Sequence, residues 1–244
     1  MFHKLVVISF LFFGIGIEGA QAQELPLFVV QGAPFTFEHQ LFYNNEQHDL
    51  DFDTRGRVRS RHQAAGVSLG YSLTDTIQVA LHGGTLVNPE VSNSVSTWRG
   101  HSGYFYGLEV ADHIFPATEE WPGILVQVGV GSQTSFFDRQ QTAGDQAPID
   151  QKMRDLRYGG SAVATWRFKS ITPYFGPRVE GSDVKWSDNR AAAGSPSHVE
   201  GHLSKHVGVV AGCSFSIFQG LELQIEGRAL GETSIRASVQ WLKY

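Results

Sequence analysis

The chain of 244 residues contains a single cysteine, Cys213, so an intramolecular disulfide is impossible. It also lacks an excess of basic residues, because 19 Lys and Arg stand against 24 Asp and Glu and give a formal net charge of −5. That balance gives no support for nucleic-acid binding. Beyond the N-terminal region no apolar run reaches the length of about 18 residues that a membrane-spanning helix needs, so such a helix is excluded there.

The first residues have the composition of a secretory signal peptide. The short basic stretch Met1–Lys4 is followed by the apolar run Leu5–Ile17 and by the small-x-small triplet Ala20-Gln21-Ala22. The apolar run is too short to span a bilayer comfortably, since a spanning helix needs about 20 apolar residues. We therefore predict a signal peptide over residues 1–22 and cleavage after Ala22.

Alternation of apolar and polar residues dominates the rest of the chain. Ser68–Gly84 reads SLGYSLTDTIQVALHGG, in which two alternating runs flank the polar turn Thr74-Asp75, as in a β-hairpin. Similar runs recur and predict ten strands, at Phe35–Asn44, Val58–Leu73, Thr76–Leu86, Gly100–Phe115, Gly123–Phe136, Arg154–Lys169, Ile171–Trp186, Glu200–Phe218, Leu221–Ala229 and Ser234–Tyr244.

The predicted connections alternate in length. Short or medium ones fall at Thr74-Asp75, Pro116–Pro122, Ser170 and Gln219-Gly220, and long polar ones at Asn45–Arg57, Val87–Arg99, Phe137–Met153 and Ser187–Val199. Transmembrane barrels have short periplasmic turns and longer extracellular loops. We therefore predict a periplasmic N-terminal segment over 23–34 and an outer-membrane barrel domain over 35–244.

The two faces of the predicted strands favour a barrel over a soluble sandwich. Opposite the apolar stripe lie acids and bases in similar number, which a narrow interior must pair. The expected lumen charge network comprises Glu38, Glu109, Arg178, Glu180, Glu226, Arg228 and Arg236, with Glu222, Arg167 and Lys169 on the same face. Aromatic residues near strand ends are expected to form interfacial girdles, namely Tyr43, Tyr104, Trp166, Trp186 and Trp241.

With its signal peptide, its hairpin repeat and the ending GETSIRASVQWLKY, the chain resembles the small bacterial outer-membrane barrels of the opacity-protein and OmpA/OmpX-like group. The resemblance implies that the last strand is read by the barrel-assembly machinery, with Tyr244 as the terminal aromatic residue and Leu242 two positions before it. It identifies an architecture and not an activity.

Three carboxylates in the first predicted loop are weak candidates for a metal site. Asp49, Asp51 and Asp53 alternate along the chain as in the start of a calcium loop, but an EF-hand requires Gly at loop position 6 and Glu at position 12. Thr54 and Ser60 occupy those positions, so the EF-hand is rejected. We expect a solvated loop without a resident metal.

Two arrangements suggest hydrolytic chemistry. His202 and Ser204 form a His-x-Ser pair similar to that of outer-membrane lipid A deacylases, with Glu200 as a possible orienting acid. In the predicted strand Glu200–Phe218, Val207, Val209 and Ala211 place lipid at odd positions, which predicts that His202 and Ser204 face inward, away from lipid. Ten strands are also typical of the omptin proteases, but their Asp-x-His pair is absent from this sequence.

These patterns predict an all-β fold, an antiparallel transmembrane up-and-down barrel of ten strands with eight as the alternative, in a bacterial outer membrane. We expect a non-enzymatic protein without cofactors, with long extracellular loops for surface interaction and a charge-filled lumen. Its expected partners are outer-membrane lipid and lipopolysaccharide, the barrel-assembly machinery and an extracellular ligand. A surface hydrolase acting on lipid A or peptides and a narrow pore are the alternatives.

Overall fold

The computed structural model describes residues 36–53, 56–142, 145–188, 198–204, 206–218, 220–230 and 232–243. These residues form antiparallel strands of one closed sheet: β1 Phe37–Phe52, β2 Gly56–Ser72, β3 Ile77–Ser92, β4 Ser96–Phe115, β5 Gly123–Thr142, β6 Asp145–Thr165, β7 Ile171–Asp188, β8 His198–Leu203, β9 Val207–Phe218, β10 Leu221–Ala229 and β11 Glu232–Lys243. Within them, no helix is long and apolar enough to cross a membrane. The predicted signal peptide and the segment 23–34 lie outside the described residues.

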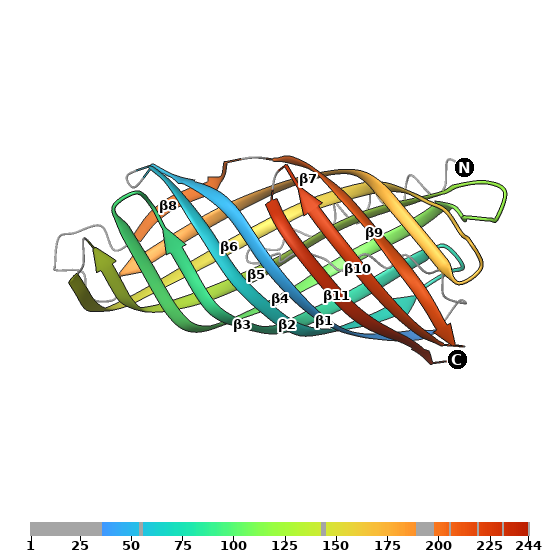
Figure 1. Cartoon of the computed structure of the whole chain (residues 1–244), viewed down its shortest axis with the longest axis horizontal. Helices are drawn as coiled ribbons and strands as arrows, with labels where there is room; N and C mark the ends of the chain where they lie inside the picture. The colour runs from blue at the N-terminus through green and yellow to red at the C-terminus, as the bar shows by residue number, and fades with distance from the viewer. Residues whose placement is uncertain are drawn as a thin grey trace.

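The ring has different sizes at its two ends. In the half that carries the C-terminal end of β11, β1 pairs with β11 and β7 pairs with β9, which closes a ring of ten described strands. In the other half the short strand β8 pairs with both β7 and β1, so eight described strands close the ring. The β10–β11 hairpin ends partway along the barrel, as Figure 1 shows. The predicted ten-stranded barrel is confirmed, and the alternative count of eight describes its other half.

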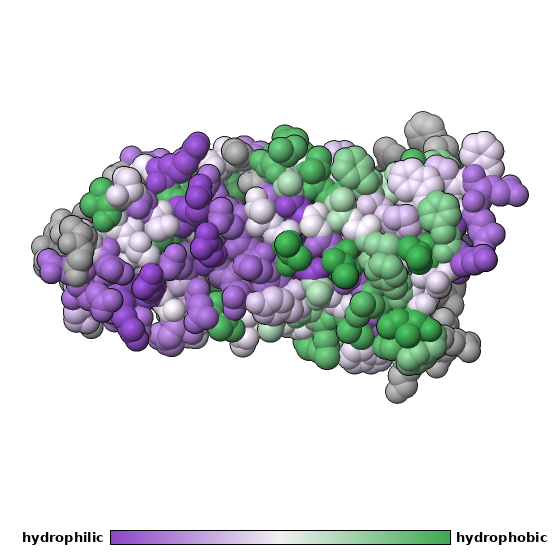
Figure 2. All heavy atoms as spheres, viewed as in Figure 1, coloured by the Kyte–Doolittle hydropathy of each residue, from purple (hydrophilic) through white to green (hydrophobic). Residues whose placement is uncertain are grey.

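The outer surface divides into two zones along the barrel axis. Around the ten-stranded half, large apolar side chains point outward, including Leu41, Leu69, Leu81, Phe175 and Ile235, each at least 49% exposed. Figure 2 shows this apolar belt as the green half of the molecule, whereas the other half is mainly hydrophilic. A continuous exposed apolar surface of this kind marks contact with a membrane or a partner. The hydrophilic half is called the outer half below.

Three predicted long loops are instead β-structure, which corrects the prediction of long extracellular loops. Asn45–Phe52 extends β1, Val87–Ser92 extends β3, and the 137–153 region is divided between β5 and β6. The alternation continues there with its faces exchanged: Leu50 and Phe52 point inward, and Asp49 and Asp51 point outward. A pattern search for apolar residues on the outer face missed these stretches because their apolar residues face the interior.

Candidate functional site

The interior of the ten-stranded half is polar and densely hydrogen-bonded. Near its open end, Gln240 donates to Glu38 (2.7 Å) and Gln40 donates to Ser238 (2.9 Å). Further in, the Tyr174 hydroxyl donates to Glu226 (2.9 Å), which also accepts from Arg228 Nε (2.6 Å). These contacts link β1 to its neighbour β11, and β7 to β10 past the intervening β9, along the inner wall of the barrel.

The seven residues of the predicted lumen charge network lie in this region. Glu38, Glu109, Glu180, Glu226, Arg228 and Arg236 are buried, and the side chain of Arg178 is largely buried. Arg178 donates to Glu180 (2.6 Å) and to Glu232 (3.4 Å), and the Arg236 guanidinium lies 4.3 Å from the centre of the Phe42 ring. Arg167 and Lys169 are exceptions to the expectation, because they lie exposed in the turn between β6 and β7.

Several lumen groups have no protein hydrogen-bond partner among the described residues. Both carboxylate oxygens of Asp112 and both ring nitrogens of His82 are buried in this state. Glu109, on the neighbouring strand β4, accepts from Gln127. Buried polar atoms without partners are costly unless water satisfies them, so this half of the lumen requires water.

A compact charge cluster lies where the ring narrows from ten strands to eight. Arg157 donates to Glu46 and, through Nε, to Asp155 (2.8 Å). His48 lies 3.0 Å from Glu46, and His62 Nε2 lies 2.9 Å from the other oxygen of the same carboxylate. All five side chains are almost completely buried.

Electrostatics keep the centre of this cluster ionised. Glu46 lies beyond the apolar belt, in the part of β1 whose outward residues are polar. Burial alone would raise the pKa of the Glu46 carboxyl, but Arg157 and His62 outweigh that effect and hold the pKa well below its usual range. A buried carboxylate paired in this way stabilises the fold only while its partners remain.

The outer half has an apolar core, which closes the barrel on that side. Trp186 is fully buried at its centre, with ring centroids 5.6 Å from Phe52, 5.0 Å from Trp98 and 5.6 Å from Phe137. The remaining core members are Leu50, Val58, Val91, Met153, Val184 and Leu203. Trp186 therefore does not belong to an interfacial girdle as predicted, whereas Tyr43, Tyr104, Trp166 and Trp241 are all exposed.

The three aspartates proposed as weak metal candidates do not converge. On the outside of β1, Asp49 accepts from Arg59 (3.1 Å) and Asp51 accepts from Arg57 (3.2 Å). Asp53 follows in the exposed turn. Among the described residues no group of three or more His, Cys, Asp or Glu side chains is placed to hold a metal ion.

The candidate hydrolytic residues do not assemble either. Glu200 and His202 point outward from β8, and Glu200 lies 3.4 Å from Lys185. The prediction that His202 faces inward is wrong, because the chain breaks its regular pairing between β8 and β9 and the alternation changes phase there. Leu203 is consequently the inward residue, and the buried Ser204 hydroxyl has no hydrogen-bond partner in the described part of the chain.

The C-terminal residues are described only in part. In the backbone register Leu242 pairs with Glu38 as part of β11. Tyr244 lies outside the described residues. Their predicted role in barrel assembly stays a prediction.

Sequence reasoning missed the central charge cluster for two reasons. The predicted loop Asn45–Arg57 includes Glu46 and His48, and the pattern that predicts the strand Arg154–Lys169 consists only of its apolar residues. The sequence nevertheless contains a signal for Asp155 and Arg157. Both lie at odd positions, and the outward-facing Tyr158 lies at an even one, so both fall on lumen positions. His62 has the same relation to Val67 on β2.

Comparison with known proteins supports the fold and goes no further. No family model matches the chain, and no curated protein matches it. Among solved structures, the outer membrane protease OmpT from Escherichia coli is similar, with a TM-score of 0.55 and 7% identity over 91% of this chain and 99% of that one. The translocator domain of the autotransporter NalP from Neisseria meningitidis is also similar, with a TM-score of 0.52 and 11% identity over 99% of this chain and 94% of that one.

The chain has the fold of outer-membrane β-barrels. At these identities the likeness concerns the fold alone, so the protease activity of one protein and the translocator role of the other are not transferred. The candidate site is consequently the barrel interior itself, in three successive layers: the polar lumen, the charge cluster and the apolar outer core.

Proposed function

We propose that the chain is a non-enzymatic bacterial outer-membrane protein, whose closed barrel carries its outer half beyond the bilayer as a rigid support for contact with the environment. The observation that carries this proposal is that, along a single strand, the apolar residues change from the outward face to the inward face. In β1, Leu41 points outward and Glu38 inward near one end, while Asp51 points outward and Leu50 inward near the other. The first arrangement suits lipid and the second suits water.

Strand length supports the same division. A transmembrane strand needs about 9–11 residues, whereas β4, β5 and β6 contain 20, 20 and 21 residues. The remaining length of each strand suits an extramembrane position, and its inward apolar residues supply the core that such a projection needs. The narrower resemblance to opacity-protein and OmpA/OmpX-like barrels remains part of this proposal, supported by the hairpin repeat.

Cysteine labelling on intact cells tests the topology. In a Cys213→Ser background, Arg59→Cys places a thiol outside the outer half and Leu69→Cys places one on the same face of β2 within the apolar belt. We expect a membrane-impermeant maleimide to label Arg59→Cys without lysis and to leave Leu69→Cys unlabelled. The lipid-embedded thiol is shielded from an aqueous reagent, while the extramembrane thiol is not.

The Cys213→Ser parent controls for background labelling. Labelling of both variants at the same rate would contradict an embedded belt. Labelling of Arg59→Cys only after cell lysis would place the outer half on the periplasmic side and would contradict a role at the cell surface.

A further inference from the structure

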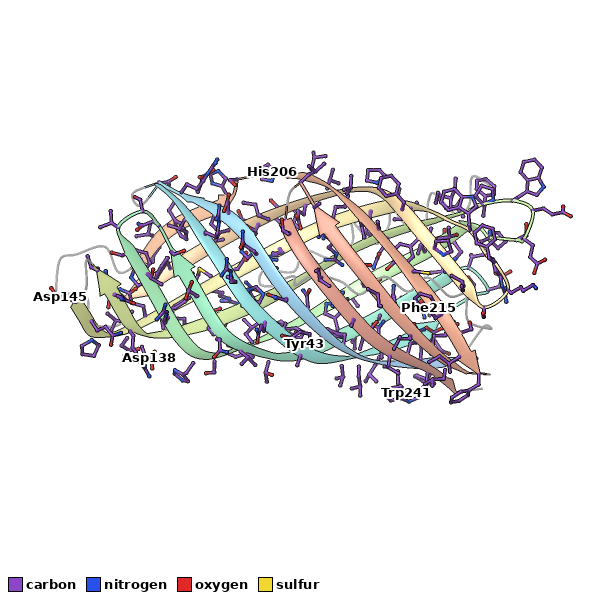
Figure 3. The ribbon with its side chains drawn as sticks, viewed as in Figure 1. Tyr43, Asp138, Asp145, His206, Phe215 and Trp241 are labelled. Atoms are coloured by element: carbon purple, nitrogen blue, oxygen red, sulfur yellow. The ribbon has the colours of Figure 1, made fainter. Side chains whose placement is uncertain are left out.

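A cavity of about 340 Å³ opens at the far end of the outer half. It is lined by Asn93, Val95, Ser96, Trp98, Gln140 and Gln151, and we call it the mouth pocket. These residues come from the turn between β3 and β4 and from the adjoining parts of β4, β5 and β6. Figure 3 shows Asp138, two positions before Gln140 on β5, and Asp145, the first residue of β6, at this end of the barrel.

The described residues that line the mouth pocket combine polar and apolar side chains, and none of them is ionisable. Three carboxamides and one hydroxyl contribute polar atoms, and Trp98 and Val95 contribute apolar surface. Val95 is 66% exposed, whereas Trp98 is buried and packs edge-on against Trp186. The pocket lining thus combines a buried indole, held by its contact with Trp186, with hydrogen-bonding side chains.

Hydrogen bonds within the protein fix the orientation of these walls. Gln151 accepts from Trp186 Nε1 (3.0 Å) and donates to Asp188 (3.0 Å). Asn93 Oδ1 accepts from the backbone N–H groups of Val95 (2.9 Å) and Ser96 (2.7 Å). A carboxamide has two N–H donors and two acceptor lone pairs, so the Gln151 amide keeps one donor and one lone pair beyond these two bonds. Side chains held in place before binding lose less entropy on binding.

These properties select the chemical class of the ligand. The six described lining residues offer no charged side chain to an ion, and a charged ligand would lose its hydration without gaining a counter-charge from them. A hydrocarbon would leave the carboxamides without partners. A molecule with many hydroxyl groups and one apolar face satisfies both the amides and the indole, and a neutral sugar ring has these features.

We propose that the mouth pocket binds an uncharged carbohydrate, of roughly one or two sugar rings given a volume at the lower end of small-molecule sites. This inference rests on the proposed function, because only an outward-facing mouth would meet glycans of the surroundings. Binding itself is measurable without that assumption, since the folded barrel can be studied in detergent.

The test uses the full chain folded in lauryldimethylamine oxide, whose head group contains no sugar and cannot compete. A panel of neutral mono- and disaccharides is screened, and the strongest binder is titrated by calorimetry against the parent chain and its variants. Gln140→Leu removes polar atoms from the pocket wall. Gln141→Leu is the matched control, because Gln141 is the next residue on β5 and does not line the pocket.

We expect saturable binding that Gln140→Leu weakens by about fivefold to tenfold, the effect of losing one hydrogen bond, and that Gln141→Leu leaves unchanged. Val95→Asp, a change at an exposed turn position, tests the rim without disturbing packing and should also weaken binding. A heat-dependent shift in gel mobility verifies the fold of each variant.

Equal binding by the two glutamine variants would overturn the inference, as would absence of binding by every saccharide in the panel. Either result would leave the labelling pattern of Arg59→Cys and Leu69→Cys untouched, so a failure of the mouth pocket and a failure of the proposed topology are distinguishable.

Discussion

At the scale of single residues, Arg157 is the main cation of the buried charge cluster. It is the cation that contacts both buried carboxylates of the central cluster, Glu46 and Asp155. Replacing it with Met would keep much of its volume but leave both carboxylates without that cation. Removing one partner of a buried ion pair costs about 3–5 kcal/mol, so we expect Arg157→Met to lower the free energy of unfolding by that order. Urea denaturation of the folded barrel in detergent would measure the loss.

Arg154→Met is the matched control for this prediction. Arg154 lies three positions earlier on β6 and points to the outside, where its side chain is exposed. Surface substitutions of this kind usually change stability by less than about 0.5 kcal/mol. Similar urea midpoints for the two variants would mean that the cluster contributes little to the fold.

The sequence predicts which residues face the lumen wherever apolar residues on the outward face show the phase of the alternation. Glu38 and Glu226 were placed correctly because lipid-facing neighbours such as Leu41 and Ile225 fix the alternation around them. His202 was not, because its phase was extended backwards from β9 across the irregular step that precedes Val207. Alternation carries information only as far as the strand remains regular.

At the scale of strands, the sequence predicted the number of elements better than their length. The predicted long loops at Asn45–Arg57, Val87–Arg99 and Phe137–Met153 have the alternation of strands, but their inward residues include apolar ones and their outward residues include charged ones. Trp98 and Phe137, for example, are buried inside, while Arg99 is exposed outside. A pattern that requires apolar residues on the outward face throughout a strand does not recognise a strand whose apolar residues move to the inward face partway along.

The reversal predicts a position-dependent response to charge along one face of β2. Leu69 lies within the apolar belt and Gln63 lies closer to the outer half, and both point outward. A lysine on the lipid face costs about 2–4 kcal/mol at the bilayer midplane and about 0–1 kcal/mol near the interface. We therefore expect Leu69→Lys to destabilise the barrel in phospholipid vesicles by the larger amount and Gln63→Lys by the smaller.

Reversible urea unfolding in the same vesicles would measure both changes. Because the two variants introduce the same residue on the same face, their difference isolates the effect of depth. Equal destabilisation would contradict a boundary of the membrane between these two positions.

At the scale of the whole molecule, closure results from layers in series rather than from one plug. The water-requiring polar lumen, the central charge cluster and the apolar core around Trp186 follow one another along the axis. The central cluster lies at the level where the β10–β11 hairpin ends, since His48 pairs with Glu232 at the start of β11. The hairpin adds two strands around the half bearing the apolar belt, and its absence beyond that level brings the remaining walls close enough for side chains to fill the outer half.

This arrangement predicts a barrel that does not conduct. The full chain, folded in detergent and added to a planar bilayer, should give no reproducible conductance steps, although the unboiled sample should migrate differently from the boiled one on a gel. The gel shift establishes a closed, detergent-resistant barrel. Protection of Leu69→Cys from the maleimide establishes that the barrel is inserted in the membrane. A lack of conductance could therefore not be attributed to an unfolded sample. Trp186→Ala should remain silent too, because the Arg157 cluster still blocks the axis below it. Reproducible steps from the unmodified chain would show that the layers open together, and would favour the narrow pore over a rigid support.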